Sequence, residues 1–146
     1  MTAKVHSDYL HQVYRVKLFV KLVNRVAAAI KKYRKSHPFE AIAFTGTSGA
    51  ALAYPVSAKL GIPLLCIRKG NNNHFKNPVE GYVGAKSYAI IDDFIDTGDT
   101  LRKILKEMKK ESSYWDHGPA KPTVIFLYTS YGPKGKTWNS IPVVRV

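Results

Sequence analysis

Apolar residues fall into short continuous runs that are separated by longer stretches with helical spacing. A strand that is buried on both faces is continuously apolar, so the short runs predict strands at 41–45, 64–68, 88–91, 123–129 and 142–146. Helical spacing predicts one long helix or two over about 7–35, and helices over 49–60 and 100–110. The polar stretches 69–86 and 111–122 are predicted to be loops. Strands that alternate with helices favour an α/β fold with a mostly parallel sheet of about five strands, in a single domain over residues 1–146.

The segment 88–101 carries the most specific pattern of the chain. The apolar run 88–91 ends in Asp92 and Asp93, two apolar residues follow, and the turn 96–100 then opens a helix. Open α/β sheets bind ligands at the carboxyl ends of their strands. A Thr/Gly turn before a helix offers free N–H groups and a helix dipole to a phosphate. The two carboxylates are suited to ribose hydroxyls, directly or through a divalent metal, so a sugar phosphate is the expected ligand.

This segment resembles the signature of the type I phosphoribosyltransferases, which use 5-phosphoribosyl 1-diphosphate (PRPP) to place ribose 5-phosphate on a nitrogen base. The resemblance implies a central parallel sheet with a small hood, built from residues 1–38, 130–146 or both. It also implies that the turn binds the 5-phosphate through Asp96, Thr97, Gly98, Asp99 and Thr100. Asp99 departs from the family pattern, where Gly or Lys is common. A carboxylate there is compatible with phosphate if it points away or matches the charge of the helix start.

A second segment follows the first predicted strand and begins a helix. Its small residues and hydroxyls form an anion-binding turn, or alternatively a plain strand–helix turn. The resemblance implies that it holds pyrophosphate through Thr45, Gly46, Thr47, Ser48 and Gly49. Several relatives place Lys or Arg in this loop and this chain has neither, so the charge is expected to come from backbone, metal or the long loop 69–86.

The strand 64–68 runs into that long loop, which begins Arg68-Lys69. The orotate enzymes resemble this part most closely, and the matching residues are Arg68, Lys69, His74, Glu80 and Gly81. Asn72 stands where they carry a Lys, and Lys76 is a candidate to replace its charge. The resemblance implies a loop that closes over PRPP, with Arg68 and Lys69 on the pyrophosphate and Lys69 and His74 in catalysis. The alternative is a surface hairpin with incidental basic residues.

The implied activity is a Mg²⁺-dependent transfer to an orotate-like or purine base. Asp92 and Asp93 are the implied catalytic pair and the implied metal ligands, directly or through water, and Asp93 is alternatively a proton acceptor for the base. The partners are then PRPP and a nucleobase, and a homodimer is expected, as in many relatives.

The net charge of +13 over 146 residues leaves a second hypothesis open. A basic field favours PRPP capture, but it is also typical of nucleic-acid binding, so the alternative is a PRPP-binding regulator that binds nucleic acid. The intact acid pair and the Arg68-Lys69 loop favour the enzyme. Basic residues crowd the first predicted helix and are interpreted as a solvated face spread around it: Lys17, Lys21, Arg25, Lys31, Lys32, Arg34 and Lys35. No apolar run is long enough to span a bilayer, and the single Cys66 cannot form an internal disulfide, so a cytoplasmic protein is expected.

Overall fold

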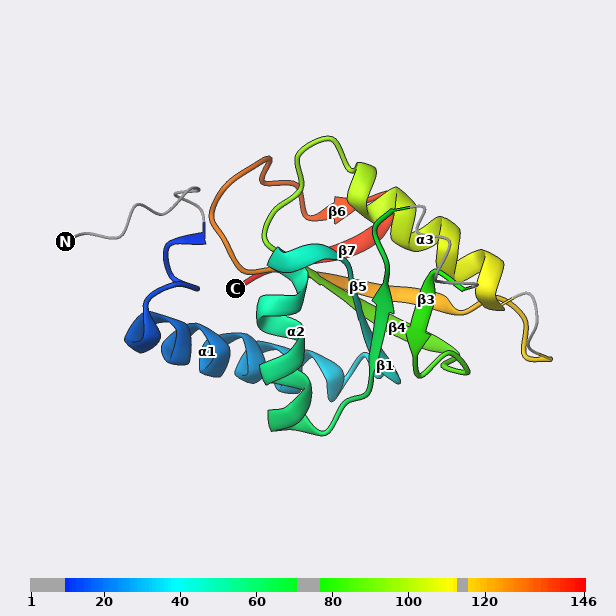
Figure 1. Cartoon of the computed structure of the whole chain (residues 1–146), viewed down its shortest axis with the longest axis horizontal. Coiled ribbons are helices and arrows are strands. Elements are labelled where there is room, and N and C mark those ends of the chain that lie inside the picture. Colours follow the sequence, from blue (N-terminus) through cyan, green and yellow to red (C-terminus); the bar gives the residue numbers. More distant parts are fainter. Residues whose placement is uncertain (1–9, 71–76, 113–115) are drawn as a thin grey trace.

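The computed structural model describes residues 10–70, 77–112 and 116–146. Within them the chain alternates between strands and helices, as predicted (Figure 1). The helices are α1 (Val16–Arg34), α2 (Gly46–Leu60) and α3 (Asp99–Ser112). The strands are β1 (Ala41–Phe44), β2 (Leu64–Ile67), β3 (Val79–Gly81), β4 (Ser87–Asp92), β5 (Lys121–Leu127), β6 (Thr137–Trp138) and β7 (Ile141–Arg145).

The strands form one sheet in the order β3-β2-β1-β4-β5-β7-β6. Five strands run parallel to one another: β2, β1, β4, β5 and β7. This confirms the predicted mostly parallel sheet. The short strands β3 and β6 add antiparallel pairs at the two edges. The sheet therefore has seven strands in the described residues, where about five were predicted.

Helices cover both faces of the sheet, because the central strands bury side chains on both sides. Ile42 and Phe44 of β1 pack in the cluster that contains the apolar sides of α1 and α2. Ala41 and Ala43 of the same strand pack in the cluster that contains Leu101 and the rest of the apolar side of α3. Figure 1 shows α1 and α2 on one side and α3 on the other. The result is a three-layer α/β/α arrangement with β4 at its centre.

The largest differences from the prediction are the starts of two helices and the presence of two additional strands. The first helix begins at Val16 rather than near residue 7, because Arg15 is extended, with φ −115° and ψ 108°. Helix α2 begins at Gly46 rather than Gly49, so most of the predicted anion loop is its first turn. Residues 79–81 of the predicted loop 69–86 form β3, because Val79 is buried against the edge of the sheet. Strand β6 lies in the tail, where no strand was predicted.

The parallel arrangement brings several chain segments to one edge of the sheet. Strands β1, β2, β4 and β5 all end there, and the residues that follow β1, β2 and β4 are the ones with predicted roles in ligand binding. In the described part of the chain, no helix has both the length and the hydropathy needed to cross a bilayer. The hood predicted from residues 1–38 and 130–146 stays a prediction, and residues 1–9 lie outside the described part.

Candidate functional site

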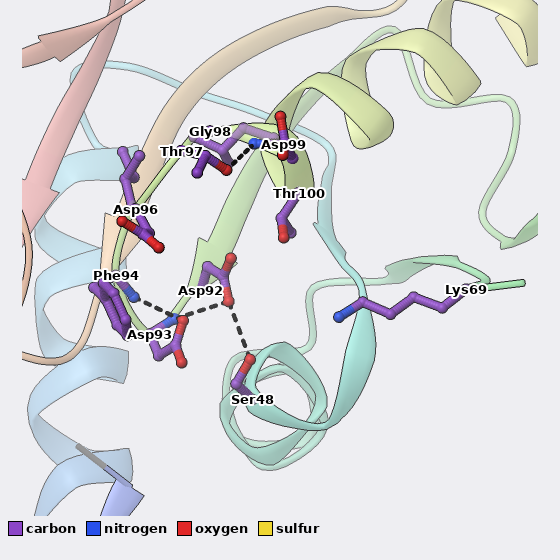
Figure 2. A pocket seen from close by; sticks show the side chains of 12 residues that line it. Ser48, Lys69, Asp92, Asp93, Phe94, Asp96, Thr97, Gly98, Asp99 and Thr100 are labelled. Carbon is purple, nitrogen blue, oxygen red and sulfur yellow. Dashed lines mark hydrogen bonds between the residues drawn. The ribbon is translucent and has the colours of Figure 1, made fainter. Parts of the chain in front are cut away.

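A buried pair of carboxylates lies at the carboxyl end of the central strand (Figure 2). Asp92 is the last residue of β4 and Asp93 follows it, and they are 6% and 9% exposed. The residues after β5 remain hydrogen-bonded to the backbone of the acid pair. The N–H of Tyr128 donates to the carbonyl of Asp92 at 3.2 Å, and the N–H of Thr129 donates to the carbonyl of Asp93 at 3.1 Å. The acid pair is therefore fixed by the sheet itself.

Three hydrogen bonds orient these carboxylates. The Oδ1 atom of Asp92 accepts from the Oγ of Ser48 at 3.3 Å and from the N–H of Asp93 at 2.9 Å. The Oδ1 atom of Asp93 accepts from the N–H of Phe94 at 2.8 Å. Burial, reinforced by the neighbouring Asp93 carboxylate, raises the pKa of Asp92 from 3.8 to about 7. Two carboxylates held so close in a poorly solvated place are suited to bind a cation or hydroxyl groups.

The turn 96–100 lies beside the acid pair and leads into α3. Gly98 has φ +84°, in the left-handed region that favours glycine, and it is buried beneath Trp138. A Cβ at Gly98 would lie 2.9 Å from the indole Nε1 of Trp138, so the packing also requires glycine. The Nη1 of Arg102 donates to the carbonyl of Thr97 at 3.0 Å. The N–H of Asp99 donates to the hydroxyl of Thr97 at 3.3 Å, and the first residues of α3, Asp99 to Leu101, line the cavity. The positive end of the helix dipole therefore lies at the cavity, as an anion site requires.

The departure from the family pattern at Asp99 has a structural explanation. Its carboxylate forms an ion pair of 2.8 Å with the guanidinium of Arg102, one turn further along α3. The Asp99 side chain is 81% exposed, so its charge is both paired and solvated. A negative residue in the first turn also suits the helix dipole. An exposed and paired carboxylate at the start of a helix is compatible with a phosphate at the neighbouring turn, which is the condition stated above for Asp99.

The residues that precede and open α2 form another wall of the site. The buried hydroxyl of Thr45 donates to the carbonyl of Ile67 at 2.6 Å and fastens the end of β1 to the end of β2. Ser48 lines the cavity, and its carbonyl accepts a 2.6 Å hydrogen bond from the hydroxyl of Tyr128. Thr47 is exposed. The free N–H groups here belong to a helix N-terminus and not to a loose loop, which adds a second helix dipole to the site.

Lys69 brings positive charge to the N-terminus of α2. A Cβ at Gly46 would lie 2.7 Å from the Nζ of Lys69, so the ammonium group lies directly over this glycine, whose φ is +69°. Figure 2 shows Lys69 reaching in from the side of the cavity opposite the turn. The turn that opens α2 contains no cation of its own, and Lys69, the second residue after the neighbouring strand β2, supplies one.

The other predicted cations are placed differently. Arg68 does not line the cavity: its Nη2 forms a 2.7 Å ion pair with Glu80 across the β2–β3 pair. His74, Asn72 and Lys76 lie outside the described residues. Among the residues described, the cavity of about 230 Å³ thus brings together the acid pair, the turn, Ser48 and Lys69.

Two contributors were not predicted from the sequence. Tyr128 and Thr129 follow β5 and hold the backbone of the α2 N-terminus and of Asp93, the latter through a 3.0 Å bond from the Thr129 hydroxyl. Their position at the end of the strand that neighbours β4 is the feature of the sequence that could have indicated this role. Trp138 of β6 packs against Gly98 and thereby supports the turn 96–100 from the tail of the chain.

Asp92 and Asp93 are the candidate ligands for a metal. The described residues contain no cluster of three or more His, Cys, Asp or Glu side chains that would hold a metal ion by themselves. Mg²⁺ commonly binds through one or two carboxylates and completes its shell with water and substrate phosphates. The buried pair, in which burial and the neighbouring Asp93 carboxylate raise the pKa of Asp92, fits that mode, because a bound cation would offset both effects.

Comparison with known proteins gives the following relatives. No protein-family model matches the chain. The orotate phosphoribosyltransferase of Rhizobium meliloti (strain 1021) is 25% identical over 131 residues, which cover 88% of this chain and 54% of that protein. The chain therefore spans about half the length of this curated relative.

Solved structures show the same fold at lower identity. Orotate phosphoribosyltransferase from Francisella tularensis matches with a TM-score of 0.66 at 16% identity, over 90% of this chain and 66% of that one. Adenine phosphoribosyltransferase from Thermoanaerobacter pseudethanolicus matches with a TM-score of 0.61 at 16% identity, over 90% of this chain and 80% of that one. The predicted resemblance is thus confirmed for sequence and for fold.

Proposed function

The chain has the fold of the type I phosphoribosyltransferases and is similar in sequence to orotate members of that family, and from this premise we propose that it transfers ribose 5-phosphate from PRPP to a nucleobase with release of pyrophosphate. One observation carries the proposal: a single cavity is lined by a buried acid pair, the N-terminal turn of α3, and Lys69 beside the N-terminus of α2. These three groups correspond in chemistry to the ribose, the 5-phosphate and the pyrophosphate of PRPP.

In this proposal, the turn 96–100 binds the 5-phosphate. Its backbone N–H groups and the hydroxyls of Thr97 and Thr100 donate to phosphate oxygens, and the α3 dipole favours the negative charge. The Arg102–Asp99 ion pair keeps the one carboxylate of the helix start from repelling it. Fixing the phosphate fixes the ribose ring over the acid pair, which orients its C1 atom for attack.

The pyrophosphate leaves from the opposite side of the ribose. We assign it to the N-terminus of α2, residues 45–49, and to the ammonium of Lys69. His74 is a further proposed contact, as the family pattern implies, and Arg68 would reach the pyrophosphate only by leaving its ion pair with Glu80. The base nitrogen forms a bond to C1 while the bond from C1 to the pyrophosphate oxygen breaks. Positive charge builds up on the ribose and negative charge on the leaving group, so the protein contributes positioning and electrostatic stabilisation.

Asp92 and Asp93 would hold Mg²⁺, directly or through water. A bound Mg²⁺ supplies positive charge near the ribose hydroxyls and the pyrophosphate oxygens. In its absence the chain's own groups still orient the carboxylates, through Ser48 and the backbone N–H of Asp93. Asp93 is alternatively the proton acceptor for the incoming base.

The proposed acceptor is an orotate-like base, with a purine as the second class. The curated relative is an orotate enzyme, and its similarity extends over most of this chain. A structural neighbour of comparable TM-score is an adenine enzyme, so adenine belongs in the same assay. A homodimer is proposed along with the activity, and sedimentation equilibrium tests it.

The test measures pyrophosphate release from PRPP and Mg²⁺ with orotate, uracil, adenine, hypoxanthine, guanine and xanthine in separate reactions. The blank is Asp92→Asn/Asp93→Asn, and the matched control is Asp116→Asn, which also removes a carboxylate but one that is exposed and lies outside the cavity. We expect release with one base, reduced by about 100-fold or more in the blank and largely retained in the control. Chelation of Mg²⁺ is expected to abolish it. Equal release from the blank would refute the assignment of the acid pair.

A second candidate function is a PRPP-binding regulator without turnover, favoured by the net charge of +13. The same assay separates the two functions. Measurable PRPP binding without release for any of the six bases would sink the transferase and leave the regulator.

A further inference from the structure

The cations of α1 have no carboxylate partner on the helix. Between Val16 and the residue after Arg34 there is no Asp or Glu, and the cations there are Lys17, Lys21, Arg25, Lys31, Lys32, Arg34 and Lys35. At 3.6 residues per turn, all of these except Arg34 fall within about 120° of the helix circumference. They lie opposite the buried stripe that contains Leu22, Val26 and Ile30. The interpretation that these charges are spread around the helix is therefore wrong, because they form one exposed stripe.

Exposure of charge opposite the core is expected of any amphipathic helix, but a single sign of charge is not. Lys17 lies in the first turn, where the dipole disfavours cations and where no acidic residue is present. The pairs Lys17/Lys21 and Lys21/Arg25 have i,i+4 spacing and repel each other. The cations in the first half of α1 therefore oppose helix stability, and only those of the last turn, Lys31, Lys32 and Arg34, are favoured by the dipole.

Helix α3 provides a comparison on the opposite face of the sheet. It is also rich in cations, but Asp99, Glu107 and Glu111 lie among them. Asp99 pairs with Arg102 at 2.8 Å, as i,i+3 residues of opposite charge do. The exclusively positive charge is thus a property of α1 and not of every helix in this basic chain.

A groove continues the α1 stripe onto α2. It has a volume of about 590 Å³ and is lined by Lys31, Arg34, Lys35, Pro38, Lys59, Leu60 and Ile62. Its lining contains four cations and no carboxylate, over a floor of apolar side chains. Figure 1 shows α1 and α2 side by side in the same layer. None of these residues lines the cavity at the carboxyl end of β4.

We propose that the α1 stripe and this groove together bind the phosphate backbone of a single-stranded nucleic acid. A row of exposed lysines leading into a cationic groove suits a ligand with regularly spaced negative charges. A membrane surface is a poorer fit, because α1 exposes no Trp, Phe or Leu for insertion, and its exposed large apolar residues are Val16 and Val20.

The test is fluorescence anisotropy with a labelled single-stranded RNA of mixed sequence, titrated at several salt concentrations. The variant is Lys21→Gln/Lys31→Gln/Lys35→Gln, and the matched control is Lys106→Gln/Lys109→Gln/Lys110→Gln on α3, which removes the same charge from exposed positions. We expect the α1 variant to lose about 100-fold in affinity at about 0.1 M salt, and its salt slope to fall in magnitude by about 2. The control is expected to bind nearly as wild type. Neither variant is expected to lower the thermal midpoint or the pyrophosphate release of wild type, since all six lysines are exposed and none lines the cavity.

Three results would overturn the proposal. One is wild-type affinity weaker than about 10⁻⁴ M at physiological salt, the lower end of ordinary non-specific binding. Another is an equal loss in both variants, which would show that only total charge matters. The third is tighter binding to polyglutamate or to anionic lipid vesicles than to the RNA, which would assign the surface to a protein or to a membrane. Because turnover is measured separately, failure of RNA binding and failure of the transferase activity are distinguished.

Discussion

Replacement of Asp92 by Asn should stabilise the folded protein at neutral pH while it removes activity. The carboxyl of Asp92 is 6% exposed, and burial together with Asp93 raises its pKa from 3.8 to about 7. An Asn side chain retains an Oδ1 acceptor for the Ser48 hydroxyl and the Asp93 N–H. The substitution therefore removes a buried charge without removing its hydrogen bonds.

The sign and size of the effect follow from proton linkage. Between pH 4 and pH 7 the unfolded chain has released the Asp92 proton and the folded chain still holds it, so the stability of the wild type falls as pH rises. This loss of unfolding free energy begins at about pH 4 and is complete above about pH 7. The difference between the folded and unfolded pKa values of Asp92 corresponds to a loss of about 4 kcal/mol as an upper bound. The amide introduced by Asp92→Asn does not titrate in this range, so the variant does not lose this unfolding free energy as the pH rises.

The assay is urea unfolding without Mg²⁺ at pH 4, 6 and 8, followed by tryptophan fluorescence, for wild type, Asp92→Asn and Asp99→Asn. We expect Asp92→Asn to exceed wild type by about 2–4 kcal/mol at pH 8, and the difference to disappear near pH 4. Asp99→Asn is the matched control, because its side chain is 81% exposed, and it should change stability little at any pH. A variant that is less stable than wild type at pH 8, or a difference that does not vary with pH, would refute the reasoning.

Three further substitutions test individual contacts. Lys69→Gln should raise KM for PRPP by about 10-fold or more, which steady-state kinetics check. Its free energy of unfolding should stay within about 0.5 kcal/mol of wild type in urea unfolding, because Lys69 is exposed. Gly98→Ala should lower stability by about 1–3 kcal/mol and weaken PRPP binding, because φ is +84° and the new methyl would meet Trp138, and calorimetry measures both effects. Tyr128→Phe should cost about 1 kcal/mol and raise KM for PRPP more than it lowers kcat, since it frees the carbonyl of Ser48, and an unchanged KM would contradict this.

The parts of the site that are close together in the sequence were predictable. The contacts between residues that are far apart in the sequence were not. The β4 run, the acid pair and the turn 96–100 lie within a dozen residues, so their order along the chain determines their order in space. The contact between Lys69 and Gly46 joins residues from two different strand ends, and no pattern within either segment predicts it. The antiparallel strand β3 was missed for the same reason, because its pairing with β2 places Glu80 opposite Cys66 across a long connection.

The order of the strands also divides the site into two halves with different tolerance to change. Strand β4, which carries the acid pair, has three strands on each side, so its amide hydrogens should be among the slowest to exchange in the molecule. Lys69 follows β2, which is next to the edge strand β3. The acid pair, which is proposed to hold the ribose, is therefore tied to the global stability of the domain. Lys69, one of the two groups proposed for the leaving pyrophosphate, lies near the margin, where insertions and substitutions are least costly, and laboratory evolution of this scaffold should find its adaptive changes there.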